Sequence, residues 1–158
     1  MALTLNTNSF VSLADAVAYF ADRLDVAAWI AATDAIKSQA LVTATLQLND
    51  LSWIGTAISE SQPLAFPRSG TYFDPRLGYE VSLPGTVPSR ILTATYELAY
   101  HLLNNDGLLD DSGTVSNLNI SSISLQIKSF PSTIPPVVKR IIAPLLVNAG
   151  ANHWWRAN

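Results

Sequence analysis

Residues 56–87 limit the folds open to this chain more than any other part of the sequence. Prolines and glycines interrupt the stretch repeatedly, at Pro63, Pro67, Gly70, Pro75, Gly78, Pro84 and Gly85. Proline removes a backbone donor and glycine favours turns, so no regular element of any length fits there. An irregular stretch of this length inside a small domain is typical of a functional or interface loop. We therefore expect a long irregular loop at 56–87.

Helical periodicity predicts helices on both sides of this loop. The patterns cover residues 9–24, a short segment at 25–32 that carries Trp29, residues 33–55 and, after the loop, residues 87–107. The residues that recur at helical spacing, and that we expect to be buried, are Leu13, Val17, Phe20, Leu24, Ile36, Ala40, Leu41, Ala44, Leu48, Leu51, Ile91, Leu92, Thr95, Leu98, Ala99, Leu102 and Leu103.

The ends of these helices carry recognisable signals. Small polar residues are preferred as N-terminal caps, proline suits the first turn, and glycine often follows the last turn. The signals are Ser12 with Asp15 three residues later, Thr33 or Asp34, Gly55, Pro88 and Gly107.

The C-terminal part of the chain changes character twice. Ile123, Leu125 and Ile127 alternate with polar residues, which is the period of a half-buried strand. A proline-initiated helix follows and is broken near Pro144, before a tail that contains adjacent tryptophans. We predict a mainly α fold, a small helical bundle with a long irregular loop, a short β-strand or hairpin excursion and an extended C-terminal arm. Within a single domain, the bundle and its loop 56–87 occupy residues 1–112, the β excursion 113–130, and the C-terminal helix and arm 131–158.

The composition suggests that partner proteins cover part of the surface, and it argues against tight binding to nucleic acid. Hydrophobic residues make up 49% of the chain and charged residues only 13%, which suggests apolar surface that partners cover. The net charge is −3, and no basic cluster exceeds the pair Lys139–Arg140. Tight nucleic-acid binding needs several cations on one face, so this balance argues against it.

No arrangement of residues implies a reaction. There are no cysteines, and the two histidines, His101 and His153, lie far apart in sequence. Phosphate-loop and nucleophile-elbow motifs are absent from the sequence as well. We expect no enzyme activity, no cofactor and no metal. The first ten residues do not resemble a signal peptide, and Lys139, Arg140 and prolines interrupt the longest apolar run, so we also expect no membrane span.

The aromatic residues allow two interpretations. They could stack on bases, as in proteins that bind single strands, but that mechanism also needs an electrostatic track. Between Trp53 and Tyr79 the only basic residues are Arg68 and Arg76, so we favour packing in the core or between subunits. Trp154 and Trp155 are expected to anchor in a partner's pocket, the alternative being an unstructured tail.

Several stretches together resemble a tailed-phage family known as DnaT-like single-stranded-DNA-binding proteins. They are "SFVSLADAVAYFADRL", "WIAATDAIKSQALVTATLQLND", the loop "QPLAFPRSG", "VPSRILTATYELAYHLL", "ISLQIKSF" and "PPVVKRIIAPLL". The resemblance covers most of the chain, and its Pro-Arg-Ser-Gly block is the most specific part. It implies a helical fold with a late strand and a C-terminal helix.

The short proteins of this family also look like head–tail connector, or adaptor, proteins of tailed bacteriophages. That likeness implies a homo-oligomeric ring, commonly twelve-fold, between the portal protein and a downstream tail or stopper protein. Genomic DNA would pass through the bore without sequence-specific binding, and an acidic ring would repel it. The protein would be made in the host bacterial cytoplasm and reside in the virion. The alternatives are a single-stranded-DNA-binding accessory protein of phage replication and a small host-interacting protein without a ring.

We expect the loop "QPLAFPRSG" to act as a clasp that folds the long loop back on the helices. Phe66 would anchor it, and Arg68 would bond backbone carbonyls or a neighbour's carboxylate. The residues expected to contact the portal or a neighbouring subunit are Phe66, Arg68, Tyr72, Arg76, Lys139, Arg140, His153, Trp154, Trp155 and Arg156.

Overall fold

The computed structural model describes residues 2–104, 117–120, 123–126 and 134–147, and its fold is mainly helical with small β excursions, as predicted. The helices are α1 (Leu13–Ala21), α2 (Ala27–Ala31), α3 (Asp34–Asn49), α4 (Ser89–Asn104), α5 (Pro136–Ile142) and the 3-10 helix η1 (Ala143–Leu145). The strands are β1 (Thr56–Ala57), β2 (Arg68–Ser69), β3 (Thr71–Asp74), β4 (Tyr79–Ser82), β5 (Asn117–Ile120) and β6 (Ile123–Gln126). The predicted arm, residues 148–158, lies outside the described residues.

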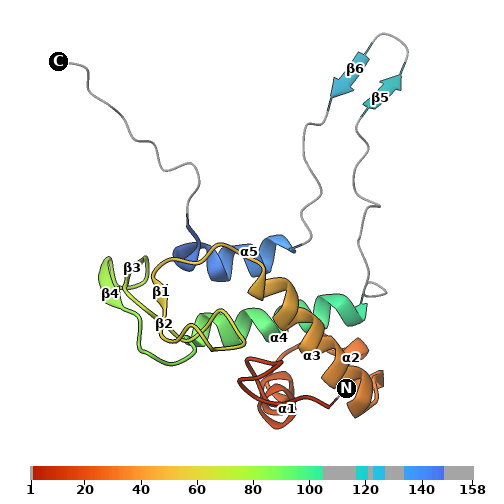
Figure 1. The fold of residues 1–158 in the computed structure, drawn as a ribbon. Coiled ribbons are helices and arrows are strands. Elements are labelled where there is room, and N and C mark those ends of the chain that lie inside the picture. The colour runs from red at the N-terminus through yellow and green to blue at the C-terminus, as the bar shows by residue number, and fades with distance from the viewer. Residues whose placement is uncertain (1, 105–116, 121–122, 127–133, 148–158) are drawn as a thin grey trace, which may run out of the picture.

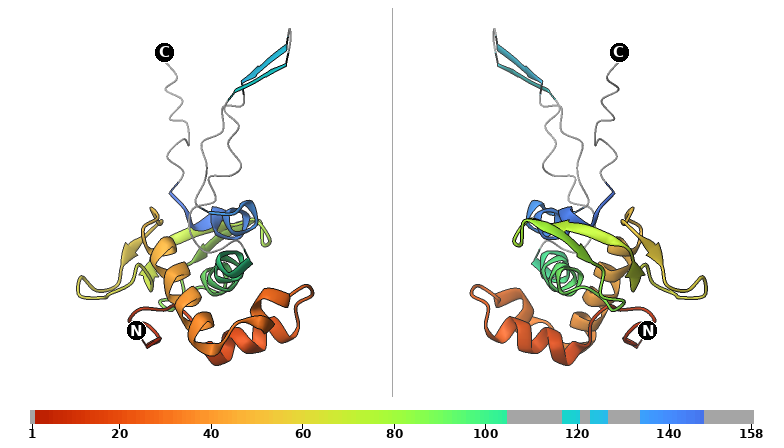
Figure 2. Two further views of the ribbon diagram at one scale, coloured as in Figure 1. Left: turned by 90° about the vertical axis from the view of Figure 1, so that its right-hand side faces the viewer. Right: turned by 90° about the vertical axis from the view of Figure 1, so that its left-hand side faces the viewer.

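Helix α4 is the centre of the bundle. Helices α3 and α5 both pack against it, α2 contacts it as well, and α1 packs on α3. Figures 1 and 2 show α5 on one side of α4 and the α1–α2 pair on the other. Burial of α4 on several sides explains why Ala94, Leu98 and Ala99 are fully inaccessible to solvent.

Predicted caps begin the first and third helices. Ser12 Oγ accepts the backbone N–H of Asp15 and donates to its carboxylate at 2.6 Å, and Thr33 Oγ1 accepts from Ile36 N. Thr33 therefore caps α3, and Asp34 is its first residue. Each cap satisfies one of the amide donors that a helix start leaves unpaired.

The predicted buried faces need correction in three places. Val17 and Ile36 are each 46% exposed, and Leu24 is 91% exposed. Helix α1 ends at Ala21, so Leu24 is no longer part of its face. The helix packs through Ala16 and Phe20 instead, which lie one turn apart and turn Val17 toward solvent.

The prediction that residues 56–87 hold no regular element is wrong. Strand β1 pairs with β2, and β3 pairs with β4, both antiparallel. The strands are only two to four residues long, and the breakers stand in the turns between them, such as Pro75 and Gly78 between β3 and β4. The prolines and glycines therefore limit the length of the strands but do not prevent strands from forming.

Two further segments complete the described chain. Strands β5 and β6 form an antiparallel pair within the predicted β excursion, with Ile120 opposite Ile123. Helix α5 begins at Pro136, as the proline-initiated pattern predicts, and changes into η1 around Pro144. After η1 the chain is tied back to the segment that follows α3, because Ile54 N donates to Leu145 O and Val147 N donates to Ser52 O, each at 3.0 Å.

Candidate functional site

Phe66 closes the long loop onto the core. Its side chain is 3% exposed and meets two core rings edge-on, Phe10 with centroids 6.2 Å apart and Trp53 at 5.1 Å. The Phe66–Pro67 peptide bond is cis. The loop thus carries its own hydrophobic anchor into the space between the N-terminal segment and the end of α3.

Arg68 secures the same loop with its guanidinium. The group donates to Ile54 O at 2.8 Å and Gly55 O at 2.6 Å, and to Trp53 O and Ala65 O at 3.3 Å. All four acceptors are backbone carbonyls of this chain. The predicted clasp, with Phe66 as anchor and Arg68 bonding carbonyls, is confirmed within the chain; contact of either residue with a partner stays a prediction.

The prediction that Gly55 ends α3 is wrong. Gly55 instead forms part of the clasp. The helix already ends at Asn49. Gly55 has φ +73°, and a Cβ placed on it would lie 2.2 Å from Ser69 O. Only glycine allows the two backbones to approach this closely in a left-handed conformation.

A buried carboxylate organises the β3–β4 hairpin. Asp74 is 1% exposed, and its Oδ1 accepts Arg76 N and Arg90 Nη2, each at 2.9 Å. Its Oδ2 accepts Arg76 Nη2 and the Tyr72 hydroxyl, each at 3.2 Å. The hydrogen bonds from Arg76, backbone first and then side chain, together with those from Arg90, hold the pKa of Asp74 well below its usual range.

Arg90 connects this carboxylate to the rest of the fold. Its Nη1 donates to Ile141 O at 3.3 Å while Nη2 holds Asp74. One side chain of α4 therefore binds both the hairpin and α5, and β3 also contacts η1 directly. Figure 1 and both views of Figure 2 show the hairpin and α5 side by side.

Exposed aromatic rings and a cation occur on the hairpin and further cations on neighbouring α5, although Phe73 and Tyr79 project from opposite faces of the hairpin, because Phe73 pairs with Glu80 and Tyr79 with Asp74. The Arg76 side chain is 71% exposed, and Phe73 and Tyr79 are 56% and 59% exposed. Lys139 and Arg140 are exposed on neighbouring α5. We call these five residues, Phe73, Arg76, Tyr79, Lys139 and Arg140, the hairpin–α5 surface.

Charge is distributed unevenly over the described chain. Residues 134–147 carry two cations and no acid, whereas residues 2–55 carry the acids Asp15, Asp22, Asp25, Asp34 and Asp50. Their two cations are engaged, Arg23 with Glu97 at 2.8 Å and Lys37 with Asp34 at 3.4 Å. The net charge of −3 thus hides a basic segment at α5 and η1, although the neighbouring hairpin also carries an exposed acid, Glu80.

The Glu97 cluster ties α1 to α4. Glu97 is 7% exposed and accepts the Tyr19 hydroxyl at 2.6 Å as well as the Arg23 guanidinium. Burial and this hydrogen bond to Glu97 raise the pKa of Tyr19 well above its usual value. Arg23 also lies 4.6 Å from the centroid of the Tyr100 ring. Since every group in the cluster has a partner, its evident role is to hold the two helices together.

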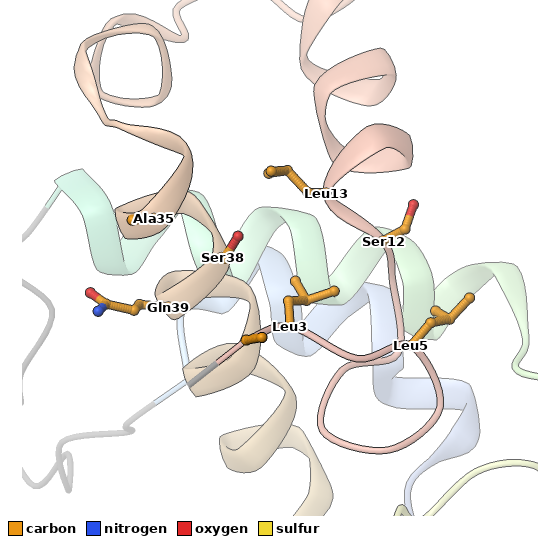
Figure 3. Close-up of a pocket in the computed structure, with 8 residues that line it drawn as sticks. Leu3, Leu5, Ser12, Leu13, Ala35, Ser38 and Gln39 are labelled. Carbon is orange, nitrogen blue, oxygen red and sulfur yellow. The ribbon is translucent and has the colours of Figure 1, made fainter.

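A groove lies on the opposite side of the molecule, where the N-terminal segment, α1 and α3 meet (Figure 3). Its volume is about 640 Å³. The residues that line it are Ala2, Leu3, Leu5, Ser12, Leu13, Ala35, Ser38 and Gln39.

In the described part of the chain, no three metal-ligating side chains gather into a possible metal site. The helices among the described residues are all too short or too polar to cross a membrane.

The structure separates the predicted site residues into groups. Phe66 and Arg68 form the clasp, Tyr72 and Arg76 surround Asp74, and Lys139 with Arg140 lies on α5. The remaining four, His153, Trp154, Trp155 and Arg156, lie outside the described residues.

Sequence reasoning missed Asp74 and Arg90. The sequence Asp-Pro-Arg at 74–76 is a turn signal of the kind in which an Asp side chain bonds the amide two residues later, so Asp74 could have been found. Arg90 could not, because its two partners lie 16 and 51 residues away in sequence.

The protein is small and mainly helical, with exposed aromatic rings and a cation on the β3–β4 hairpin and exposed cations on α5. The chain belongs to the family described as "Putative DnaT-like ssDNA binding protein", whose profile matches residues 2–157. Searches of curated proteins and of solved structures found no significant match. The resemblance seen in the sequence is therefore confirmed at the level of the family, whose description includes neither a ring nor a portal.

Proposed function

We propose that this protein binds single-stranded DNA along the hairpin–α5 surface. The observation that carries the proposal is that the β3–β4 hairpin exposes Phe73, Tyr79 and Arg76 and lies beside α5, which exposes Lys139 and Arg140. Proteins that bind single strands combine these two elements, with bases stacked on aromatic rings and the phosphate backbone following cations. Membership in the DnaT-like family supports the same function.

The uneven charge distribution weakens the objection that the net charge of −3 raised. Phosphates respond to the local field more than to the sum over the protein, because salt screens charges beyond about 10 Å at 0.1 M. The strand would meet the side around α5, whereas Asp15, Asp22 and Asp25 belong to α1 and the segment before α2, on the other side of α4 (Figures 1 and 2). Three phosphate contacts would give a salt dependence with a slope of about −2 in log K against log salt.

Arg68 takes no part in this binding. As a basic residue in the aromatic-rich loop it was an obvious phosphate contact, but four carbonyl acceptors engage its guanidinium. Asp74 likewise holds Arg76 in place through the backbone and the side chain, which leaves one edge of its exposed guanidinium for a phosphate.

The experiment is a titration of fluorescent oligothymidine by anisotropy over a range of salt concentrations. The double substitution Lys139→Ala/Arg140→Ala should weaken binding and reduce the salt slope by about 1.4, two phosphate contacts at about 0.7 each. Phe73→Ala should weaken binding without changing the slope, by about 1–3 kcal/mol if one base stacks there. Lys37→Ala, which removes a charge from the α1–α3 side, is the matched control. Equal effects of all three variants, or no binding by the unmodified protein at low salt, would contradict the proposal.

A second candidate function, the head–tail connector, has its own supporting observation. Leu24 and Ile30, on the α1–α2 side, are 91% and 73% exposed, and Leu46 on α3 is 54% exposed. Large aliphatic side chains exposed this fully favour burial by another chain. We propose that in a virion such a surface would join ring neighbours beneath a portal, with a structural and not a catalytic role. Native mass spectrometry of the protein mixed with the portal protein from the same genome tests this. One copy per portal subunit supports it, and the absence of any complex counts against it.

A further inference from the structure

We propose that the groove between the N-terminal segment, α1 and α3 receives the C-terminal segment, residues 148–158, of a second copy of this protein. The inference is independent of DNA binding, because the groove and the hairpin–α5 surface lie on opposite sides of α4. The contact joins two different surfaces, so it is head-to-tail, and repetition of it gives a closed ring or an open chain of subunits.

The groove has the size and lining of a site for an apolar anchor. Its volume of about 640 Å³ falls within the 300–1,000 Å³ that is usual for binding pockets. Figure 3 shows Leu3, Leu5 and Leu13 among the residues that line it, together with Ser12 and Ser38. Aliphatic walls with a few hydroxyl groups suit an indole ring, which is apolar except for one N–H donor.

The C-terminal segment carries the residue types that anchor interfaces. It reads "NAGANHWWRAN" and includes Trp154, Trp155 and Arg156 within three positions. Tryptophan and arginine are enriched among the residues that dominate binding energy. The segment contains no acid and carries Arg156, while the exposed Asp15 stands near the groove beside Ser12, so the charges of the two partners are complementary.

Chain length favours the groove of another copy over that of the same copy. The hydrogen bond from Val147 N to Ser52 O fixes the point at which the segment leaves the fold, beside η1. Trp154 follows seven residues later, a reach of at most about 25 Å when fully extended. The α3 residues that line the groove, Ala35, Ser38 and Gln39, precede Ser52 by 13 to 17 residues, which places the groove about 20–25 Å away along the helix. Trp154 could therefore reach the groove of its own copy only with the segment fully extended along α3, whereas the groove of a second copy sets no such requirement.

Sedimentation velocity of the full chain over a concentration series tests the proposal with two variants. Trp154→Ala/Trp155→Ala removes the anchors, and Ala35→Arg fills the groove from an exposed position and repels Arg156. Each variant alone should self-associate at least thirtyfold more weakly than the unmodified protein, which is the loss expected for a hot-spot tryptophan. Ala18→Arg, on an exposed position of α1 outside the groove, is the matched control and should associate normally.

Mixing the two variants gives the decisive result. The Ala35→Arg protein keeps an intact segment and the tryptophan variant keeps an intact groove, so together they should form a 1:1 dimer and nothing larger. An unmodified protein that stays monomeric at the highest attainable concentration overturns the proposal. So does association that survives either variant, or variants that fail to combine while their thermal melting matches the unmodified protein. Oligonucleotide binding by Ala35→Arg should be unchanged, so the two proposals fail separately.

Discussion

Replacement of Arg68 by methionine tests whether Arg68 stabilises the clasp or contacts DNA. Methionine keeps an unbranched apolar stem and removes every donor of the guanidinium. Hydrogen bonds from charged groups contribute about 1.5–3 kcal/mol each. The two shortest, to Ile54 O at 2.8 Å and Gly55 O at 2.6 Å, would then account for about 3–6 kcal/mol. The side chain is half-buried, and water that reaches the freed carbonyls lowers the expected cost to about 2–4 kcal/mol.

Urea unfolding followed by tryptophan fluorescence measures this cost. Trp53 lies beside the clasp, with its ring 5.1 Å from Phe66, so the signal reports on the affected region. Arg68→Lys should recover less than half of the lost stability, because an ammonium cannot reach four carbonyls that a planar guanidinium spans. Arg140→Met, at an exposed position on α5, is the control and should change stability by less than about 0.5 kcal/mol.

The reasoning is refuted if Arg68→Met unfolds at the same urea concentration as the unmodified protein. A variant of normal stability that no longer binds oligothymidine would instead assign Arg68 to the DNA contact. Loss of stability with binding retained at low temperature, where the variant is still folded, is the result that the clasp predicts.

Three further predictions concern the same region. Gly55→Ala should cost more than Gly78→Ala in urea unfolding, because both positions have positive φ but only at Gly55 does a Cβ meet backbone, 2.2 Å from Ser69 O; equal costs would mean that the clasp relaxes freely. Phe66→Ala should destabilise the fold by about 3–5 kcal/mol, the usual cost for a buried phenylalanine, and an effect below 1 kcal/mol would deny it an anchoring role. The lowered pKa of Asp74 stabilises the folded state above the unfolded value of about 3.9, and this stabilisation is lost as the pH falls toward the folded value; Asp74→Asn should therefore flatten the dependence of the urea midpoint on pH below about 4, and an unchanged profile would contradict it.

Asp74 is expected to affect both the stability of the fold and the proposed DNA binding. The carboxylate positions Arg76, which belongs to the proposed DNA-binding surface, and Arg90, which holds α5 through Ile141 O. Asp74→Asn should for this reason loosen the hairpin from α5 and weaken binding, although it removes a negative charge. A purely electrostatic effect would have the opposite sign. The direction of the change in affinity thus reports whether the surface depends on this geometry.

The amino-acid sequence by itself determined the features that depend on near neighbours. The cap at Ser12, the proline start of α5 and the turn-forming breakers act through hydrogen bonds and steric limits within a few residues. The clasp also belongs here, since the acceptors of Arg68 lie at most 15 residues away. An arginine next to a buried aromatic in a rigid loop has few acceptors other than nearby carbonyls.

Only the tertiary structure decided which faces are buried and which charges meet. Val17 and Ile36 follow a helical period but face solvent, because α1 and α3 pack along neighbouring stripes. Arg90 finds Asp74 and Ile141 only once α4, the hairpin and α5 are assembled. Periodicity says that a helix has an apolar side, but the direction of that side depends on the helices that pack against it. The uneven charge distribution has the same origin, since it appears only when segments far apart in the chain are brought side by side.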